Sequence, residues 1–306
     1  MKPVCHSFRP VLAISLAATL LLLAPSSRSQ TDLENAIKQF SGETVKGYIQ
    51  PVADLFGANM HAGYYHSAYI PVSGFSIGFD IIAMGSVVQD AQKKYIANTP
   101  AGFDPGSFET ATIFGGKGTT VSDKTITGLQ FRGSDGIINT SMFPLAVPQL
   151  RIGSLYGTEL LLRFAIIPSM NDGAIPVTKL WGVGANHSLS QYIPNSPLDI
   201  ATGFFYDSFT MGDIINFKGM TANLHASKSI KILILYGGVA WEKSTMNLAY
   251  NSSDTSVREE VNLDLTGSNT FRFTMGVGVS LGIVKIFADA NFGSVTHYSG
   301  GIGFGR

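Results

Sequence analysis

The residues most suggestive of catalysis are His225 and Ser227, which are separated by a single residue. On a β-strand such side chains share one face, so the imidazole can act as a base for the hydroxyl. Two other histidine–serine pairs, at 66–67 and 187–188, are adjacent and therefore point to opposite faces. No third side chain that would orient His225 is identifiable, although a hydrolytic triad requires one. We therefore predict no catalytic residue and no enzymatic activity, with a lipid hydrolase as a remaining alternative.

Metal, cofactor and nucleic-acid chemistry are also disfavoured. The histidines show no metal-ligand spacing with nearby acids, and the only cysteine, Cys5, precedes the apolar run near the start of the chain. The glycine cluster at 115–118 lacks the spacing and the following helix of a phosphate-binding loop. Basic and acidic residues balance at 21 each, so no basic excess favours nucleic acid. We predict no cofactor, no metal and no nucleic-acid partner.

A second set of charged residues occurs at alternate positions within otherwise apolar stretches. In a membrane barrel such residues face the lumen, because an arginine or lysine facing lipid costs about 2–4 kcal/mol at the bilayer midplane. Three roles remain open for them: a polar track, salt bridges that hold a plug, or a solvated lumen. The candidates are Asp80, Glu159, Arg163, Asp207, Lys231, Arg272, Lys285 and Asp289.

The elements that position these charges are strands. In FRFTMGVGVSLG, residues 271–282, apolar side chains alternate with Arg272, Thr274, glycine and Ser280, a period of two that predicts a strand. Several similar stretches reach the length of about 9–11 residues that a tilted bilayer crossing needs. The candidates are 60–68, 74–88, 107–115, 124–132, 147–155, 158–168, 176–188, 198–212, 219–227, 229–241, 244–250, 258–266, 270–281, 283–292 and 295–304.

Bacterial barrels favour even strand numbers, so we expect one candidate, 244–250, to be false. The prediction is an all-β fold, a transmembrane antiparallel β-barrel of about 14 strands, with 12 as the next value. Charged residues are only 14% of the chain, against about 25% in typical soluble domains. After residue 29 no apolar run is long enough for a membrane-spanning helix, and a closed barrel is then the only membrane-spanning alternative.

The first residues resemble an export signal. Lys2 and Arg9 precede the apolar run 11–24, and small residues follow it. We predict a signal peptide over 1–29, although a retained N-terminal anchor is the alternative. The barrel would then lie in the bacterial outer membrane. The terminal strand, which ends near Phe304, would be the part that the barrel assembly machinery recognises.

Residues 30–57 are predicted to form a helical segment that plugs the barrel formed by 58–306. Thr31 and Glu34 have the spacing of a capping box, and Gly57 is a helix stop. Inward-facing apolar residues such as Leu161, Leu233, Leu235 and Phe287 require an apolar partner, either a ligand or this segment. The apolar face of the segment comprises Leu33, Ile37, Phe40, Ile49, Val52 and Phe56.

Six tryptophan and tyrosine residues are predicted to form an interfacial girdle, because these side chains favour the boundary between lipid and water. Stacking on a ligand is the alternative role. The residues are Trp181, Tyr192, Tyr206, Tyr236, Trp241 and Tyr250.

Two stretches carry a family resemblance: GVGANHSLSQYIPNSPLDIATGFFYDSF, residues 182–209, and GGVAWEKSTMNLAY, residues 237–250. They resemble a family of outer-membrane barrels of unknown function that is distantly similar to the FadL long-chain fatty-acid transporters. The resemblance implies a plugged 14-stranded barrel that passes hydrophobic molecules by diffusion, with sideways release through its wall. Those transporters carry an Asn-Pro-Ala motif near the plug, whereas this chain has Ala58-Asn59-Met60, so no ligand residue is carried over.

The function expected from these observations is passive transport of hydrophobic, fatty-acid-like small molecules, gated by the plug. The expected partners are outer-membrane lipids and the transported molecules. A structural or adhesive barrel without transport is the principal alternative. A lipid hydrolase is the second, although Lys228 and Ser229 follow Ser227 where the outer-membrane phospholipase pattern has Asn-Gly.

Overall fold

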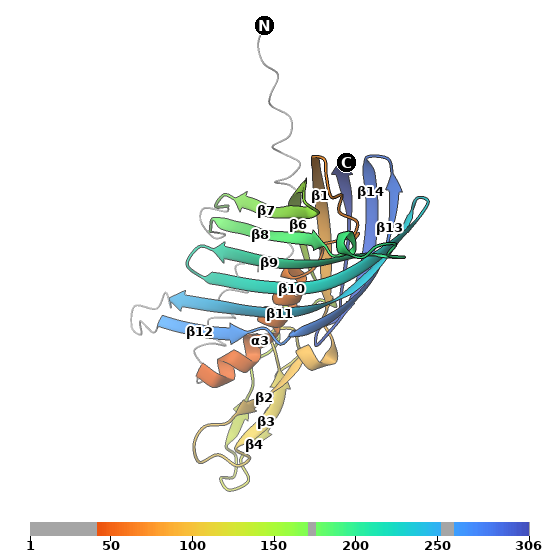
Figure 1. The fold of residues 1–306 in the computed structure, drawn as a ribbon. Helices are drawn as coiled ribbons and strands as arrows, with labels where there is room; N and C mark the ends of the chain where they lie inside the picture. Colours follow the sequence, from red (N-terminus) through yellow and green to blue (C-terminus); the bar gives the residue numbers. More distant parts are fainter. Residues whose placement is uncertain (1–41, 171–175, 252–259, 306) are drawn as a thin grey trace.

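A computed structural model describes residues 42–170, 176–251 and 260–305, and shows an antiparallel barrel with an N-terminal helix inside it (Figure 1). Each barrel strand pairs with two neighbours, and pairing of β1 with both β6 and β15 closes the sheet. In order around the wall, the strands are β1 (Ser76–Val87), β6 (Met142–Leu155), β7 (Thr158–Ile167), β8 (Thr178–Ser188), β9 (Asp199–Met211), β10 (Ile215–Ile230), β11 (Leu233–Asn251), β13 (Phe271–Leu281), β14 (Val284–Phe292) and β15 (His297–Gly305).

The all-β barrel prediction is confirmed, but the strand number is wrong. Ten strands of the described chain form the closed wall, and β12 (Glu260–Thr266) is added against the far part of β11. The candidates 229–241 and 244–250 are largely one strand, because β11 is 19 residues long and continues to Asn251, past Trp241, where its pairing with β13 ends. The candidate that we expected to be false is therefore part of a strand.

Two other candidates lie outside the wall, in the connection from β1 to β6. This connection forms two small antiparallel pairs, β2 (Lys94–Asn98) with β3 (Ser107–Ala111), and β4 (Thr120–Ser122) with β5 (Gln130–Arg132). The 3₁₀ helix η1 (Asp90–Gln92) precedes them. These strands are three to five residues long, too short to cross a bilayer. They form a small subdomain at one end of the barrel (Figure 1).

The two ends of the barrel differ in their connections. At one end, the turns β6–β7, β10–β11 and β13–β14 are short, and the β8–β9 connection contains the 3₁₀ helix η2 (Ser190–Tyr192). We call this the short-turn end. At the other end, the β1–β6 connection carries the subdomain, and β11 continues to pair with β12. We call this the long-connection end.

Helix α3 (Gly42–Met60) and the irregular segment 61–75 run through the lumen from the long-connection end to the short-turn end. Contacts along β6 show this course. Asn59 donates a hydrogen bond to the carbonyl of Phe143 near the start of β6, and Ser154 near its end bonds to Pro71. The predicted strand 60–68 is therefore wrong: these residues cross the lumen and lack a neighbouring strand with which to pair.

The helical prediction agrees with α3 from Gly42 onward, and Pro51 lies within the helix. Ile49 and Phe56 are buried in the lumen core, and Val52 packs against it. Phe56 contacts the rings of Phe209 and Phe217, with centroids 4.9 and 5.0 Å apart. Leu33, Ile37 and Phe40 lie outside the described residues. None of the helices within 42–170, 176–251 and 260–305 is both long and apolar enough to span a membrane.

The strand alternation separates the two faces of the wall. In β13, Phe271, Phe273 and Met275 are exposed on the outside, whereas Arg272 and Thr274 are buried toward the lumen. Phe287 is buried inside β14, while Ile286 is exposed. The apolar rows therefore face outward, and polar and apolar side chains together fill the lumen around α3.

Candidate functional site

The end of α3 is held by charged side chains from opposite sides of the barrel. Arg163 projects from β7 and Arg272 from β13, and these strands are five positions apart in a ten-strand wall. Both side chains are buried. They bind the backbone carbonyls of residues 60–62, where a helix C-terminus carries partial negative charge. We call these arginines, their side-chain partners and residues 60–64 the latch.

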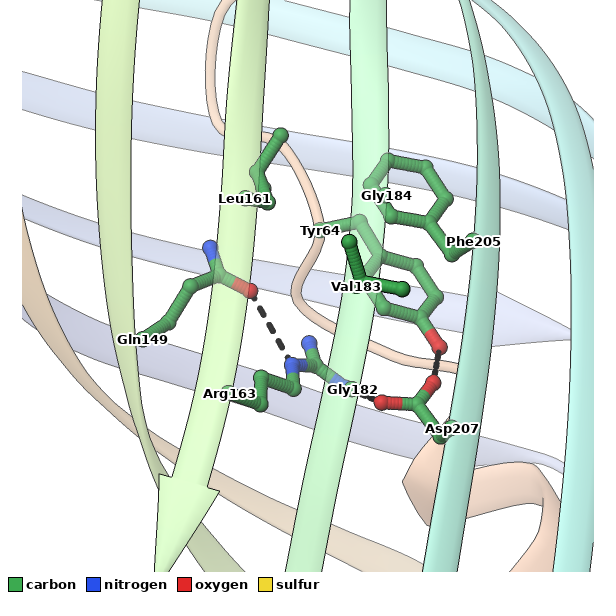
Figure 2. A pocket seen from close by; sticks show the side chains of 9 residues that line it. All are labelled: Tyr64, Gln149, Leu161, Arg163, Gly182, Val183, Gly184, Phe205 and Asp207. Carbon is green, nitrogen blue, oxygen red and sulfur yellow. Dashed lines mark hydrogen bonds and ion pairs between the residues drawn. The ribbon is translucent and has the colours of Figure 1, made fainter.

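On the β7 side, Arg163 donates hydrogen bonds to the carbonyls of Met60 (2.8 Å) and Ala62 (2.6 Å). Its Nε donates to Gln149 Oε1 on β6 at 3.0 Å. The guanidinium also lies over the Tyr64 ring, 4.0 Å from the centroid. Figure 2 shows Arg163 of β7, Gln149 of β6 and Tyr64 of the lumen segment lying close together.

Asp207 of β9 completes this side of the latch. Its carboxylate accepts a hydrogen bond from the Tyr64 hydroxyl and lies 4.0 Å from Arg163 Nη1. The Tyr64 ring stacks on Phe205, with centroids 3.9 Å apart. The space left between these side chains is too narrow to admit a water molecule. This part of the lumen is packed, not an open pocket.

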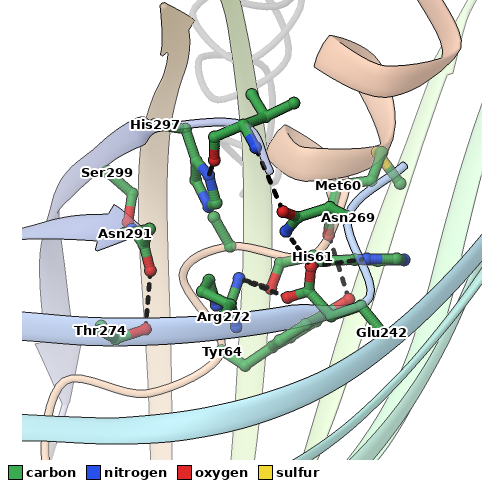
Figure 3. Close-up of polar contacts among 12 residues, drawn as sticks. Met60, His61, Tyr64, Glu242, Asn269, Arg272, Thr274, Asn291, His297 and Ser299 are labelled. Carbon is green, nitrogen blue, oxygen red and sulfur yellow. Dashed lines mark hydrogen bonds and ion pairs between the residues drawn. The ribbon is translucent and has the colours of Figure 1, made fainter. Parts of the chain in front are cut away.

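On the β13 side, Arg272 Nη1 donates to the carbonyl of His61 at 2.6 Å and pairs with Glu242 of β11 at 3.0 Å (Figure 3). Glu242 also accepts a hydrogen bond from Asn269 (2.6 Å) and lies 3.4 Å from His61 Nδ1. The close packing of His61 depends on Gly219, where a Cβ atom would come within 2.5 Å of the imidazole. Each buried arginine therefore has an acidic partner, which offsets the cost of desolvation.

A second ionic cluster lies nearer the short-turn end. Asp80 of β1 accepts hydrogen bonds from Arg151 at 2.7 and 3.0 Å, and Arg151 lies 3.4 Å from Glu159. Lys285 of β14 is half-buried on the inward face near this cluster. Asp80 is fully buried, whereas Glu159 is partly exposed.

A third group joins β11 and β14, the two strands that flank β13. Asp289 accepts a hydrogen bond from Tyr236 at 2.9 Å and another from Asn291 at 2.6 Å. Tyr236 is therefore buried and points inward, which corrects its expected place in the outer girdle. Trp181 and Trp241 are exposed on the outside, and Tyr192 is exposed in η2. The Tyr250 side chain lies outside the described ones.

The prediction that Lys231 faces the lumen is wrong. Lys231 lies in the β10–β11 turn with φ +55° and is exposed. Because the chain reverses there, the inward–outward alternation does not continue through this residue. Leu233 and Leu235, which we expected to accompany it inward, are exposed on the outer face of β11.

The histidine–serine pair has other partners. His225 is buried, stacks on Tyr65 with centroids 4.0 Å apart, and its Nδ1 lies 2.8 Å from Asn223 Oδ1. Ser227 Oγ accepts a hydrogen bond from the backbone N–H of Ala68 at 2.9 Å. Both residues thus contact the lumen segment.

Several latch residues are absent from the predictions made from the sequence. Glu242 lies between the outward-facing Trp241 and Lys243, so strict alternation would have predicted that it faces inward. Tyr64 and His61 carry no such signal, because they belong to the irregular segment 61–75, part of which the sequence pattern predicts to be a strand. Gln149 is an uncharged residue in a mainly apolar strand.

A family model described as "Family of unknown function (DUF6588)" matches residues 6–306. The chain belongs to this family. No curated protein matches it. The description of this family names no transporter, so the similarity to the FadL transporters stays a prediction.

Solved structures with a similar fold are outer-membrane proteins. The translocator domain of autotransporter NalP from Neisseria meningitidis is 10% identical, with 76% of this chain and 88% of that chain covered and a TM-score of 0.29. The loop-deletion mutant OmpTdeltaL8 from Vibrio cholerae is 7% identical, with 76% and 100% covered and a TM-score of 0.27. At these values the comparison adds nothing to the barrel that the strand pairing itself establishes.

Proposed function

We propose that this DUF6588 chain is an outer-membrane channel for small hydrophobic molecules, and that the structure is its closed state. The observation that carries the proposal is the apolar lining around α3, to which Phe205, Phe209 and Phe217 contribute. If the N-terminal segment moved away, this lining would favour an apolar solute over an ion. A general porin has a polar, water-filled interior instead.

The outer wall supports placement in a membrane. Large apolar side chains are exposed along β1, β7, β13, β14 and β15, including Phe164, Phe273 and Ile302. Exposed apolar area this continuous is unfavourable in water and favourable against lipid. In outer-membrane barrels the short turns face the periplasm, so we place the short-turn end there. The apolar terminal strand β15, with Phe304 exposed, supports recognition by the barrel assembly machinery.

The latch supports gating. The N-terminal segment enters the wall at Ser76, and around α3 it is held by side-chain contacts to its backbone. Such contacts can be exchanged for water when the segment moves. A gate requires two states with different affinity for the transported molecule. A hydrophobic solute that binds the apolar lining would stabilise the open state.

A structural barrel without transport is the second candidate. The observation that favours it is the packing of the lumen, where the gap beside Tyr64 admits no water molecule. In that case the apolar lining serves only to bind α3. The two candidates differ in whether loosening the latch creates a path.

The test uses the full chain in vesicles with a lipopolysaccharide outer leaflet, which slows entry of hydrophobic solutes. Uptake of the dye N-phenylnaphthylamine is compared for the parent chain and the double variant Arg163→Met/Arg272→Met. Transport requires faster uptake in the double variant. The control is Arg132→Gln, which removes an exposed ion pair with Asp135 in the subdomain. Uptake in both variants equal to that of protein-free vesicles would support the closed structural barrel.

A further inference from the structure

Charged residues on the outer face of the barrel are confined to one arc. In the ten wall strands as the structure describes them, the outward-facing charged residues are Lys179 on β8, Lys218 and Lys228 on β10, and Lys243 on β11. Lys228 lies toward the short-turn end and donates to the carbonyl of Pro197. The other three are exposed on the outer face. We call Lys179, Lys218 and Lys243 the lysine row.

The strand registers place the lysine row at one height on the barrel. Trp181, Ser208, Lys218 and Thr245 are successive partners across β8 to β11. Lys179 is two residues from Trp181 toward the long-connection end. Lys243 is two residues from Thr245 toward the short-turn end. The row therefore slants across the strands toward the short-turn end.

This slant matches the tilt of the barrel. The registers, followed once around the wall from Ile81 in the direction of β6, return to β1 beyond Val87, toward the long-connection end. Because the strands are tilted by roughly 35–45°, residues at equal height are not register partners. From one strand to the next they shift by about one residue toward the short-turn end. The lysine row shifts in this direction from β8 to β11, so its members lie at the same depth in a membrane.

An aromatic row lies beside the lysine row on the side of the membrane interior. Trp181, Tyr206 and Trp241 are each two residues closer to the short-turn end than Lys179, Ser208 and Lys243. The Trp181 and Tyr206 rings are 5.3 Å apart. Tryptophan and tyrosine mark the boundary of the hydrocarbon, and lysines reach past it to the headgroups. This arrangement sets the lysine row at headgroup depth, near the long-connection end.

Acidic groups of the protein do not neutralise the row among the described residues. Among the acids whose side chains do not face the lumen, those nearest to the row along the chain and across the sheet are Asp213, exposed in the β9–β10 turn, and Asp264 on the outer face of β12. Asp264 accepts a hydrogen bond from Asn247. Neither of them forms an ion pair with Lys179, Lys218 or Lys243 within the described ranges. Three positive charges at one depth thus remain available to an outside partner.

We propose that the lysine row binds the headgroup phosphates of anionic lipids in the leaflet at the long-connection end. Ammonium groups at this depth attract anionic headgroups, and the adjacent indole rings contact the acyl chains. Binding is confined to the arc from β8 to β11, because the remaining wall strands present no outward charge in the described structure. This inference rests on the proposed membrane location, but not on transport.

The two tryptophans of the chain, Trp181 and Trp241, both lie beside the lysine row and report on the lipids that touch it. The full chain is reconstituted in phosphatidylcholine vesicles that contain a minor fraction of phosphatidylglycerol. Bromine, which quenches tryptophan on contact, is placed on the chains of one lipid or the other. We expect the anionic lipid to quench more than its mole fraction predicts, and we expect salt to reduce this excess.

The triple variant Lys179→Gln/Lys218→Gln/Lys243→Gln should lose the excess, with relative affinity for the anionic lipid falling about fivefold per lysine. The matched control is Lys228→Gln, on the same face at the opposite end, which should keep it. Equal quenching by both lipids in the parent chain, or an excess that survives in the triple variant, would overturn the proposal. Absence of quenching by either lipid would instead show that the barrel is not inserted and would contradict the proposed function.

Discussion

Removal of the Arg272 guanidinium tests whether the latch holds the N-terminal segment in the lumen. Arg272→Met keeps most of the side-chain volume but deletes the ion pair with Glu242 and the hydrogen bond to the carbonyl of His61. The Arg272 and Glu242 side chains are 2% and 0% exposed. Loss of one partner from a buried pair costs about 3–5 kcal/mol, because the other charge stays buried.

This cost falls on the closed state, since water can hydrate Glu242 once the segment moves. At 1.4 kcal/mol per factor of ten, the population with an exposed segment should rise roughly a hundredfold to several thousandfold. The assay is labelling of Ala62→Cys by a membrane-impermeant maleimide in a Cys5→Ser background. Ala62 is fully buried in the closed barrel, so the labelling rate follows the exposed population.

Two further variants make the result specific. Glu242→Gln should also accelerate labelling, and its combination with Arg272→Met should cost less than the sum of the two, because the pair acts as a unit. Arg132→Gln, which breaks the exposed pair with Asp135, should leave the rate unchanged. A labelling rate in Arg272→Met within twofold of the parent rate would refute a latch that depends on this ion pair.

Three other changes have defined outcomes. Gly63→Ala should lower the thermal stability of the barrel by about 1–3 kcal/mol, because Gly63 has φ +74° and a Cβ atom would lie 2.6 Å from Ile82. Phe217→Ala, which removes a fully buried ring that packs against α3, should lower the free energy of unfolding by about 3–5 kcal/mol. Thermal melts followed by circular dichroism measure both variants. In the subdomain, hydrogen bonds from the Thr125 hydroxyl and from backbone N–H groups lower the pKa of Asp123 to about 2. The ionised Asp123 should therefore stabilise its loop fully at pH values above 3.8, the unfolded pKa. This stabilisation should be lost as the pH falls through about 2, which amide hydrogen exchange at Thr125 measures.

Each of these has a matched control. Gly74→Ala also places a side chain at positive φ, but no atom lies within 4 Å, so the difference from Gly63→Ala isolates the contact with Ile82. Phe273→Ala truncates an outward-facing ring and should melt close to the parent temperature. Asp123→Asn should remove the acid dependence of exchange at Thr125. An unchanged pH profile in that variant would contradict the assignment to Asp123.

The latch residues illustrate which site predictions succeed. Arg163, Asp207 and Arg272 were selected because a charge within an alternating apolar strand is expensive on the lipid side, and the structure places all three inward. The same rule predicts that Lys231 faces the lumen, and that prediction is wrong, because a turn interrupts the alternation there. The rule is valid only inside a strand, and the ends of strands are set by turn geometry and by pairing with distant segments.

The sequence by itself determined the class of fold and the face on which most wall residues lie. Both depend on a period of two and on the cost of exposing charge to lipid, which are properties of each strand alone. Tertiary structure decided the number of strands, the path of residues 61–75 and the pairing of Arg163 and Arg272 with the end of α3. These depend on contacts between residues far apart in the chain, such as Arg272 with His61, and a local pattern carries no information about which distant partner completes a buried charge.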